Sequence, residues 1–151
     1  MNKPAFRAVA LLAVPYLLAV PALADAGETG EALFSSICAA CHGDKGQGTE
    51  GIAPPLVDPV LWQGLGDKAP VYIAGVMAGG MSGKINANGV DYIGLVMPTQ
   101  AAHGADDLTA IAAYVLTTLN GLPAGPDKAT VEAALAKPPS HKELRALRKG
   151  E

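Results

Sequence analysis

Apolar residues recur at helical spacing in three stretches of the chain. From Glu28 to about Ala40 they fall at i, i+3 and i+4, and Ala69–Ala78 has an apolar side that ends at a pair of glycines. The clearest stretch is Asp106–Leu119, where two N-terminal acids suit the positive end of a helix and Asn120-Gly121 is a stop signal. The pattern therefore predicts three helices with one buried face each.

The segments between these helices read as loops and one hairpin. Residues 43–58 are too rich in glycine and proline for regular helix or a central strand. Asn88-Gly89 is a tight-turn signal between apolar neighbours, so Ile85–Ile93 is expected to form a small hairpin or loop.

The end of the chain differs from the rest in composition and charge. A short helical piece is expected at Thr130–Ala136, before the interruption Lys137-Pro138-Pro139. Ser140 and Glu143 then have the spacing of a capping box that opens a last, basic helix. With too few apolar residues for a second core, this extension either packs on the preceding domain, stays mobile, or serves as a docking arm for a partner.

The N-terminus has the three parts of a secretory signal. Lys3 and Arg7 precede an apolar run, Ala8–Val20, and Ala22-Leu23-Ala24 is a small-x-small cleavage site. The run is shorter than the roughly 20 residues that span a bilayer, so cleavage is expected near Ala24 rather than a retained anchor. The sequence thus predicts a periplasmic protein with a signal peptide (1–24), one domain (25–121) and a C-terminal extension (122–151).

Charge is unevenly divided between the last two parts. The whole chain has a formal charge of −3, but residues 25–121 hold ten acidic and three basic residues, whereas residues 122–151 hold four acidic and six basic ones. An acidic domain argues against nucleic acid or an anionic membrane as partner, and no stable membrane insertion is expected. It favours a redox protein with a positive docking patch, although ordinary solubilising surface charge explains it equally well.

Candidate chemistry centres on Cys38-Ala39-Ala40-Cys41-His42. Two thiols separated by two residues, followed directly by histidine, have the spacing of a covalent haem attachment site. Cys38 and Cys41 would form thioethers with the haem vinyl groups, and His42 would supply its imidazole to the iron. These are the only cysteines in the chain, and one motif predicts one haem c.

Other readings of the cysteine pair fit less well. A thioredoxin-like redox pair would need a βαβ pattern, which is not visible. A zinc site would need further ligands at tetrahedral spacing, and the sequence has no second cysteine pair. No Ser-His-Asp or paired-carboxylate arrangement suggests hydrolytic chemistry, so no catalytic residue is predicted.

A second axial ligand has to come from elsewhere in the chain. Met97 is the best candidate, because it lies in a loop that Pro98 stiffens. Met77 is expected to be a core residue, and His141 is expected to face solvent. The remaining candidates are Met81, a possible loop ligand, and His103, which would give bis-histidine coordination.

With these motifs the chain resembles class I c-type cytochromes over roughly residues 27–121. Gly30 and Phe34 match the glycine and aromatic of the family's N-terminal helix, and Tyr114 matches the aromatic of the C-terminal helix that crosses it. Met97-Pro98 resembles the family's Met-Pro loop. Pro54 matches a proline whose carbonyl accepts the Nδ1 proton of the haem histidine and so orients the ring.

The resemblance implies a fold and a function. The fold would be all-α, with helices wrapped around one covalently bound haem. The iron would have His/Met ligation, and the protein would shuttle single electrons between a dehydrogenase or respiratory donor and an acceptor, without being an enzyme itself. The segment from Ile85 to Met97-Pro98 is similar to a subgroup of bacterial single-haem cytochromes that serve periplasmic dehydrogenases.

Several alternatives remain open at this point. One alternative to a free electron shuttle is a tightly bound cytochrome subunit of a dehydrogenase complex. The other is a ligand-binding haem sensor in which Met97 leaves the iron. Trp62 is either a core residue or a donor to a haem propionate, and Tyr92 has the same two readings, with packing ahead. Lys84 is expected to be a solvated lysine.

Overall fold

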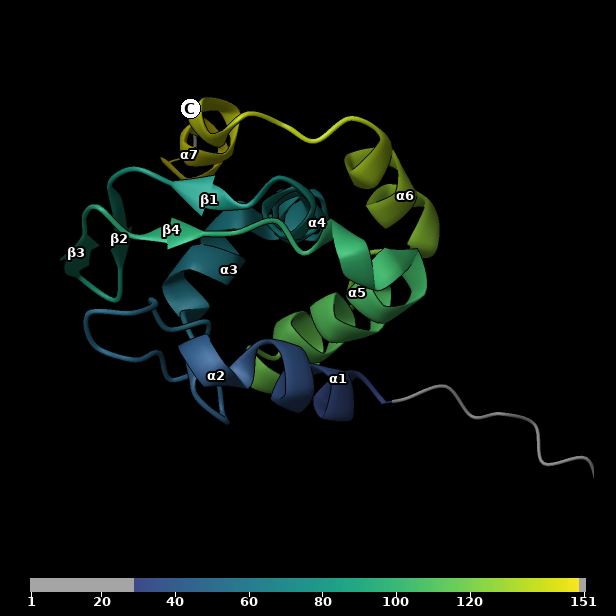
Figure 1. The fold of residues 1–151 in the computed structure, drawn as a ribbon, viewed down its shortest axis with the longest axis horizontal. Helices are drawn as coiled ribbons and strands as arrows, with labels where there is room; N and C mark the ends of the chain where they lie inside the picture. Colours follow the sequence, from purple (N-terminus) through teal and green to yellow (C-terminus); the bar gives the residue numbers. More distant parts are fainter. Residues whose placement is uncertain (1–28, 150–151) are drawn as a thin grey trace, which may run out of the picture.

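The computed structural model describes residues 29–149, so the predicted signal peptide lies outside the described residues. Helices surround a central space, and four very short strands close one side of it (Figure 1). The fold is the small, mainly helical one that the sequence predicts. Its helices are α1 (Gly30–Ile37), α2 (Ala39–His42), α3 (Pro59–Leu65), α4 (Ala69–Gly79), α5 (Gly104–Ala113), α6 (Lys128–Ala136) and α7 (His141–Lys149), with a π-helical turn at Tyr114–Leu119.

Helices α1 and α5 cross each other at close range. Gly30 lies so near α5 that a Cβ built on it would be 2.2 Å from the Ala110 carbonyl oxygen. One turn later, Phe34 is 1% exposed and its ring lies 5.4 Å from that of Tyr114, tilted by 49°. A small residue at the crossing and two rings beside it let the helices approach, as the sequence predicts.

The strands form two separate antiparallel pairs. β2 (Ile85–Ala87) and β3 (Val90–Tyr92) make the predicted hairpin around Asn88-Gly89. β1 (Met81–Ser82) pairs with β4 (Val96–Met97), so that Met81 lies directly opposite Met97. The sequence did not predict this second pair, because two-residue strands leave no alternation to detect.

The C-terminal extension packs on the domain that precedes it. α6 lies against α4 and α5, and its Val131 is fully buried (Figure 1). α7 lies against α4, where its fully buried Leu144 sits on Gly75; a Cβ at Gly75 would be 2.9 Å from the leucine. Of the three possibilities left open for this segment, packing on the domain is the one that the structure shows.

The predicted helices are confirmed with changed boundaries, and α3 was not predicted. The first helix breaks at Cys38, which ends α1 and precedes α2. The predicted helix 106–119 begins at Gly104 and turns π-helical at Tyr114. α3 has a start signal that was overlooked, since Asp58 caps the Leu61 amide at 3.1 Å and Pro59 occupies the first helical position.

The capping box at the start of α7 is confirmed. The Ser140 amide donates to Glu143 at 2.7 Å, and the Glu143 amide donates back to the Ser140 hydroxyl at 3.2 Å. The start of this helix is therefore fixed by reciprocal local bonds. Within residues 29–149, no helix is both long enough and apolar enough to cross a membrane.

Replacing Gly30 with alanine is expected to destabilise the protein by about 2–3 kcal/mol, because the new methyl group overlaps a backbone oxygen that cannot rotate away. Gly64→Ala is the control, since that α3 glycine has nothing within 4 Å of its added Cβ and should gain slightly from the loss of backbone entropy. Guanidinium unfolding of both holoproteins measures the difference. Equal effects would show that the crossing tolerates separation.

Candidate haem site

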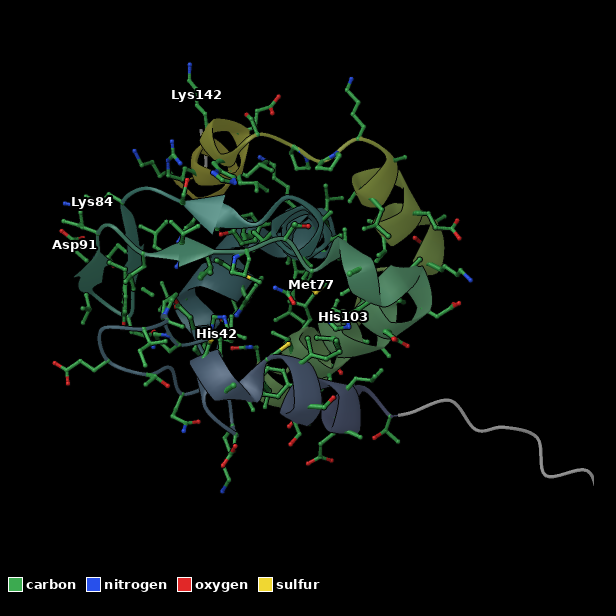
Figure 2. All side chains as sticks on the ribbon, viewed as in Figure 1. His42, Met77, Lys84, Asp91, His103 and Lys142 are labelled. Carbon is green, nitrogen blue, oxygen red and sulfur yellow. The ribbon has the colours of Figure 1, made fainter. Side chains whose placement is uncertain are left out.

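A cavity of about 290 Å³ lies between the α1–α2 segment, α4, α5 and the β1–β4 pair. Its wall includes Cys38, Cys41 and His42 from the α1–α2 segment and Met97 from β4, which lies more than fifty residues later. The rest is mostly aliphatic and aromatic, and no Lys, Arg, Asp or Glu is among the described residues that line it. Figure 2 shows His42 and Met77 at this interior, while Lys84, Asp91 and Lys142 lie at the periphery.

The His42 imidazole is buried and held by one strong hydrogen bond. It is 6% exposed, and its Nδ1 donates to the Pro54 carbonyl oxygen at 2.9 Å. A carbonyl can only accept, so Nδ1 carries the proton and Nε2 keeps its lone pair. Burial lowers the pKa of His42 and the bond to Pro54 opposes part of that shift, so the ring is neutral at pH 7. A neutral, oriented imidazole is the form that binds a metal ion.

The loop that carries Pro54 folds back onto the motif. The Gly48 amide donates to the His42 carbonyl at 2.7 Å. Gly48 has φ +82°, and a Cβ there would lie 2.6 Å from the Pro55 nitrogen, so only glycine fits. This explains why a glycine-rich, irregular stretch follows the motif: it brings the Pro54 carbonyl to the ring.

The two thiols lie on neighbouring turns at the cavity wall. Cys38 is half-buried at the end of α1, and Cys41 is exposed in α2. Burial, and then the neighbouring Cys41, raise the pKa of the Cys38 thiol to about 11. Both cysteines are free, so the protein presents two thiols at one edge of an apolar space.

Three methionines face the cavity. Met97 is half-buried on β4, and Met81 and Met77 are 6% and 5% exposed. The expectation that Met77 packs in the core is confirmed, although it also contributes to the cavity wall. The segment after Met97 is fixed on α4, because Thr99 Oγ1 donates to the Ala78 carbonyl at 2.6 Å and the Gln100 amide donates to the Met77 carbonyl at 2.7 Å.

The two remaining histidines lie elsewhere. His103 is exposed in a 3₁₀ turn and does not line the cavity. The expectation that His141 faces solvent was wrong: its ring is bonded to Ser82 Oγ at 2.5 Å and to the Gly79 carbonyl at 3.1 Å. A capping box alone does not show which residues of the helix turn inward, and here the first residue does.

Three further side chains have the following positions. Trp62 is 3% exposed and lines the cavity, and its indole N–H donates to the Leu56 carbonyl at 2.7 Å. Its ring meets that of Tyr72 edge-on at 5.9 Å. Tyr92 also contributes to the cavity wall. Lys84 is exposed, as expected of a solvated lysine, and its Nζ lies 2.6 Å from an Asp91 carboxylate oxygen.

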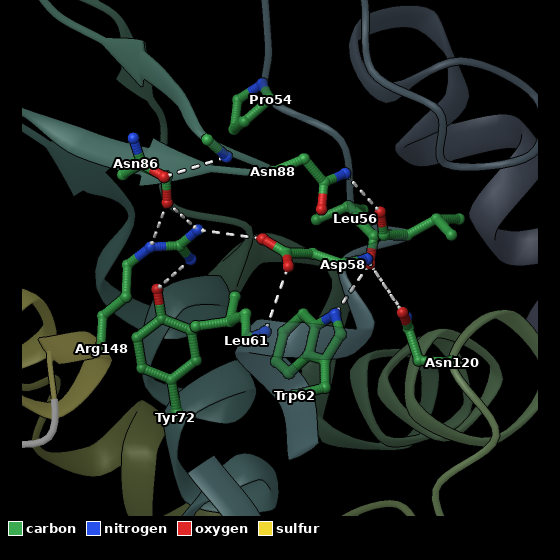
Figure 3. Close-up of polar contacts among 12 residues, drawn as sticks. Pro54, Leu56, Asp58, Leu61, Trp62, Tyr72, Asn86, Asn88, Asn120 and Arg148 are labelled. Carbon is green, nitrogen blue, oxygen red and sulfur yellow. Dashed lines mark hydrogen bonds and ion pairs between the residues drawn. The ribbon is translucent and has the colours of Figure 1, made fainter. Parts of the chain in front are cut away.

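A buried polar network lies beside the cavity, and the sequence analysis missed it (Figure 3). Asn120 is 8% exposed: its Oδ1 accepts from the Asp58 amide at 3.0 Å, and its Nδ2 donates to the carbonyls of Leu56 and Val115 at 2.9 and 2.8 Å. One side chain therefore joins the Pro54 loop to the end of the C-terminal helix of the domain. From the sequence alone, Asn120-Gly121 indicates only a helix stop.

A second, wider hollow of about 760 Å³ lies between α3 and the β2–β3 hairpin of the domain and α7 of the extension. Its lining includes Asp58, Lys84, Asp91 and Arg148, but no cysteine, histidine or methionine. Size alone would favour this hollow, whereas the chemistry of the donor set favours the smaller cavity.

The residues of the smaller cavity fit a covalently held haem. They combine two free thiols one helical turn apart, a neutral imidazole with its Nε2 available, a thioether on another segment, and apolar walls. The ligand roles of His42 and Met97 stay predictions.

Comparison with known proteins agrees with this donor set. A family model described as cytochrome c matches residues 27–119, which is more than half of the chain. The match begins just before α1 and ends with the π-helical turn, so it leaves out α6 and α7. No curated protein gives a significant match.

Asn120→Ala is expected to cost about 3 kcal/mol of unfolding free energy, because it removes three hydrogen bonds: it takes the side-chain acceptor from the Asp58 amide, the side-chain donor from the Val115 carbonyl, and one of the two side-chain donors to the Leu56 carbonyl, which keeps the Trp62 indole. The control is Asn88→Gly, which removes one exposed bond to Val57 at a position with φ +48° that glycine adopts easily. Guanidinium unfolding of the holoproteins compares the two. A cost no larger than that of the control would mean that water replaces the Asn120 contacts.

Proposed function

Because the chain belongs to the cytochrome c family over residues 27–119, we propose that it is an exported single-electron carrier with one haem bound through Cys38 and Cys41. His42 and Met97 are the axial ligands in this proposal. Family membership by itself makes the chain a haem-binding electron-transfer protein that has redox partners and is not a classical enzyme. The positions of the ligands, the compartment and the type of partner are the proposal's own additions.

The observation that carries the proposal is the composition of one cavity wall. It holds both thiols, the Nε2 side of His42 and the thioether of Met97, with no described charged side chain among them. When bound, the haem exchanges one electron as its iron passes between Fe(III) and Fe(II). An apolar wall favours the less charged state, and thioether ligation favours Fe(II) relative to a second imidazole.

The protein's own contribution is to hold these groups still. The Pro54 carbonyl fixes the His42 ring, and the bonds from Thr99 and Gln100 to α4 fix the segment that follows Met97. Ligands that are held in place in both oxidation states keep reorganisation small, which is what fast electron transfer requires. None of these groups has to move a proton for the exchange.

The contact region for redox partners is proposed at the cavity mouth. Cys41 is exposed there, and the neighbouring lining residues Ile52 and Val96 are 56% and 69% exposed. An apolar rim on an acidic domain suits weak encounters in which charge guides the approach and apolar contact brings the haem edge close.

The periplasm is the proposed compartment. Its basis is the signal-like N-terminus together with a motif whose haem attachment is completed outside the cytoplasm. A permanent place in a dehydrogenase complex is less well supported. It would use the C-terminal extension as a docking arm, but α6 and α7 bury Val131 and Leu144 against their own domain.

Covalent attachment predicts a set of masses under denaturing conditions. The protein matured in a periplasm should begin at Asp25 and retain one haem, and Cys38→Ala or Cys41→Ala should each retain a haem through the remaining sulfur. The double variant should retain none. Mass spectrometry of all four reads this out directly, and a haem that stays on the double variant would contradict attachment at these cysteines.

Ligation by Met97 predicts a Met-to-iron charge-transfer band in the oxidised spectrum. Met97→Ala should lose that band and let the reduced protein bind CO, whereas Met81→Ala, which removes the opposite residue of the ladder, should keep it. Absorption spectra of oxidised, reduced and CO-treated holoproteins make the comparison. If wild-type protein lacks the band or binds CO readily, the sensor or bis-histidine reading replaces the electron carrier.

A further inference from the structure

The inner face of α7 is occupied by three polar side chains that all reach one short segment of the domain. His141, Arg145 and Arg148 are spaced at i, i+4 and i+7, so they share one side of the helix. Their partners include the backbone of Gly79, Ser82 and Asn86. The family match ends before this helix, so nothing in the match assigns it a role.

His141 and Arg145 hold β1. The carbonyl of Gly79 can only accept, so His141 donates from Nε2 at 3.1 Å and its Nδ1 accepts the Ser82 hydroxyl proton at 2.5 Å. Arg145 Nη1 donates to the Ser82 carbonyl at 2.5 Å. Ser82 is thus bonded to α7 through both its side chain and its backbone.

Arg148 continues the contact along the same segment and ties it to the buried network (Figure 3). It donates to the Asn86 carbonyl from Nη2 at 2.6 Å and from Nε at 3.1 Å, and to the Tyr72 hydroxyl at 3.2 Å. Its Nη2 also lies 3.6 Å from an Asp58 oxygen, in a pair whose side chains are 11% and 5% exposed. A pair this well buried depends on both partners.

The segment is shaped for this contact. Gly83 has φ +94°, and a Cβ there would lie 2.8 Å from Arg145 Nη1. Gly80 has φ +73°, and its Cβ would lie 2.5 Å from the Met97 carbonyl oxygen. Glycines therefore let β1 approach α7 on one side and the Met97 segment on the other.

The register of the ladder connects α7 to Met97. Ser82 is paired with Val96, and Met81 is paired with Met97. A ladder of two residues is too short to hold its own geometry. The residues after Met97 are fixed on α4. β4 itself is paired with β1, which follows α4 directly and is bonded to α7 through Ser82.

We propose that α7 is a positioning element for the Met97 thioether: through His141 and Arg145 it holds β1, and the β1–β4 register then keeps Met97 at the cavity wall. This inference rests on the proposed function, in which Met97 is an iron ligand. Without these contacts the domain keeps its helices, but Met97 leaves the iron more often.

The test compares three variants of α7 as holoproteins. Arg145→Ala removes a bond to β1 and one positive charge. Lys142→Ala removes the same charge from an exposed position that points away from the domain (Figure 2). Arg145→Lys keeps the charge without the guanidinium geometry and should give an intermediate result.

Two measurements separate positioning from general stability. The first follows the Met-to-iron band and the far-UV helix signal through one guanidinium titration. The second is the rate at which the reduced holoprotein binds CO, which depends on how often Met97 leaves the iron. In Arg145→Ala the band should disappear at a lower guanidinium concentration than the helix signal, and CO binding should become about tenfold faster. Lys142→Ala should match the wild type.

The proposal is overturned if the band and the helix signal of Arg145→Ala shift together, or if CO binding keeps its wild-type rate. If Arg145→Ala yields no holoprotein, Ser82→Ala takes its place, because it removes only the bond to His141. It should speed CO binding about fivefold. An unchanged rate would contradict the proposal. Failure of the proposed function shows differently, because the wild type would then lack the band or Met97→Ala would keep it.

Discussion

The crossing of α1 and α5 is the contact on which the rest of the structure depends. Because Gly30 has no side chain, the α1 backbone lies directly against the Ala110 carbonyl. This contact sets the position of α1 on α5, and with it the position of Cys38 and Cys41, which follow α1. The same crossing seats Phe34 against Tyr114 beside the cavity. A wider crossing would move the attachment motif away from the wall that holds Met97. One missing methyl group thus sets the position of the side of the site that carries Cys38, Cys41 and His42.

The cavity wall is assembled from segments with very different local order. The His42 side is held by turns of helix and a tight glycine-containing loop, so most of its contacts lie within one stretch of about twenty residues, with Asn120 as the link to the C-terminal helix. The Met97 side is held by bonds between segments that are distant in sequence. Both His42 and Met97 contribute to a largely buried wall. The Met97 side depends on several separate contacts between distant segments, and losing any one of them would let Met97 move.

Much of this arrangement could be predicted from the sequence, because its signals are local. The attachment motif, the helix at Ala69–Ala78, the hairpin and the capping box depend on residues within a few positions of one another. The contacts that could not be predicted join distant residues: Asn120 to Leu56, Arg148 to Asp58, and His141 to Ser82. A polar residue in a tail or at a helix end looks solvent-exposed until its partner is known. The sequence shows that the domain is acidic and the extension basic. It does not show that residues of the two parts pair with each other, as Lys128 does with Asp106.

The position of α7 in the chain has a consequence for assembly. Synthesis proceeds from the N-terminus, so Cys38, Cys41 and His42 emerge first, Met97 follows, and the helix that holds its strand pair comes later still. An apolar cavity with one wall not yet fastened is easier for a large, flat molecule to enter than a finished one. Because α7 follows every residue of the cavity wall in the chain, the segment that fastens β1 is added after the wall itself is complete.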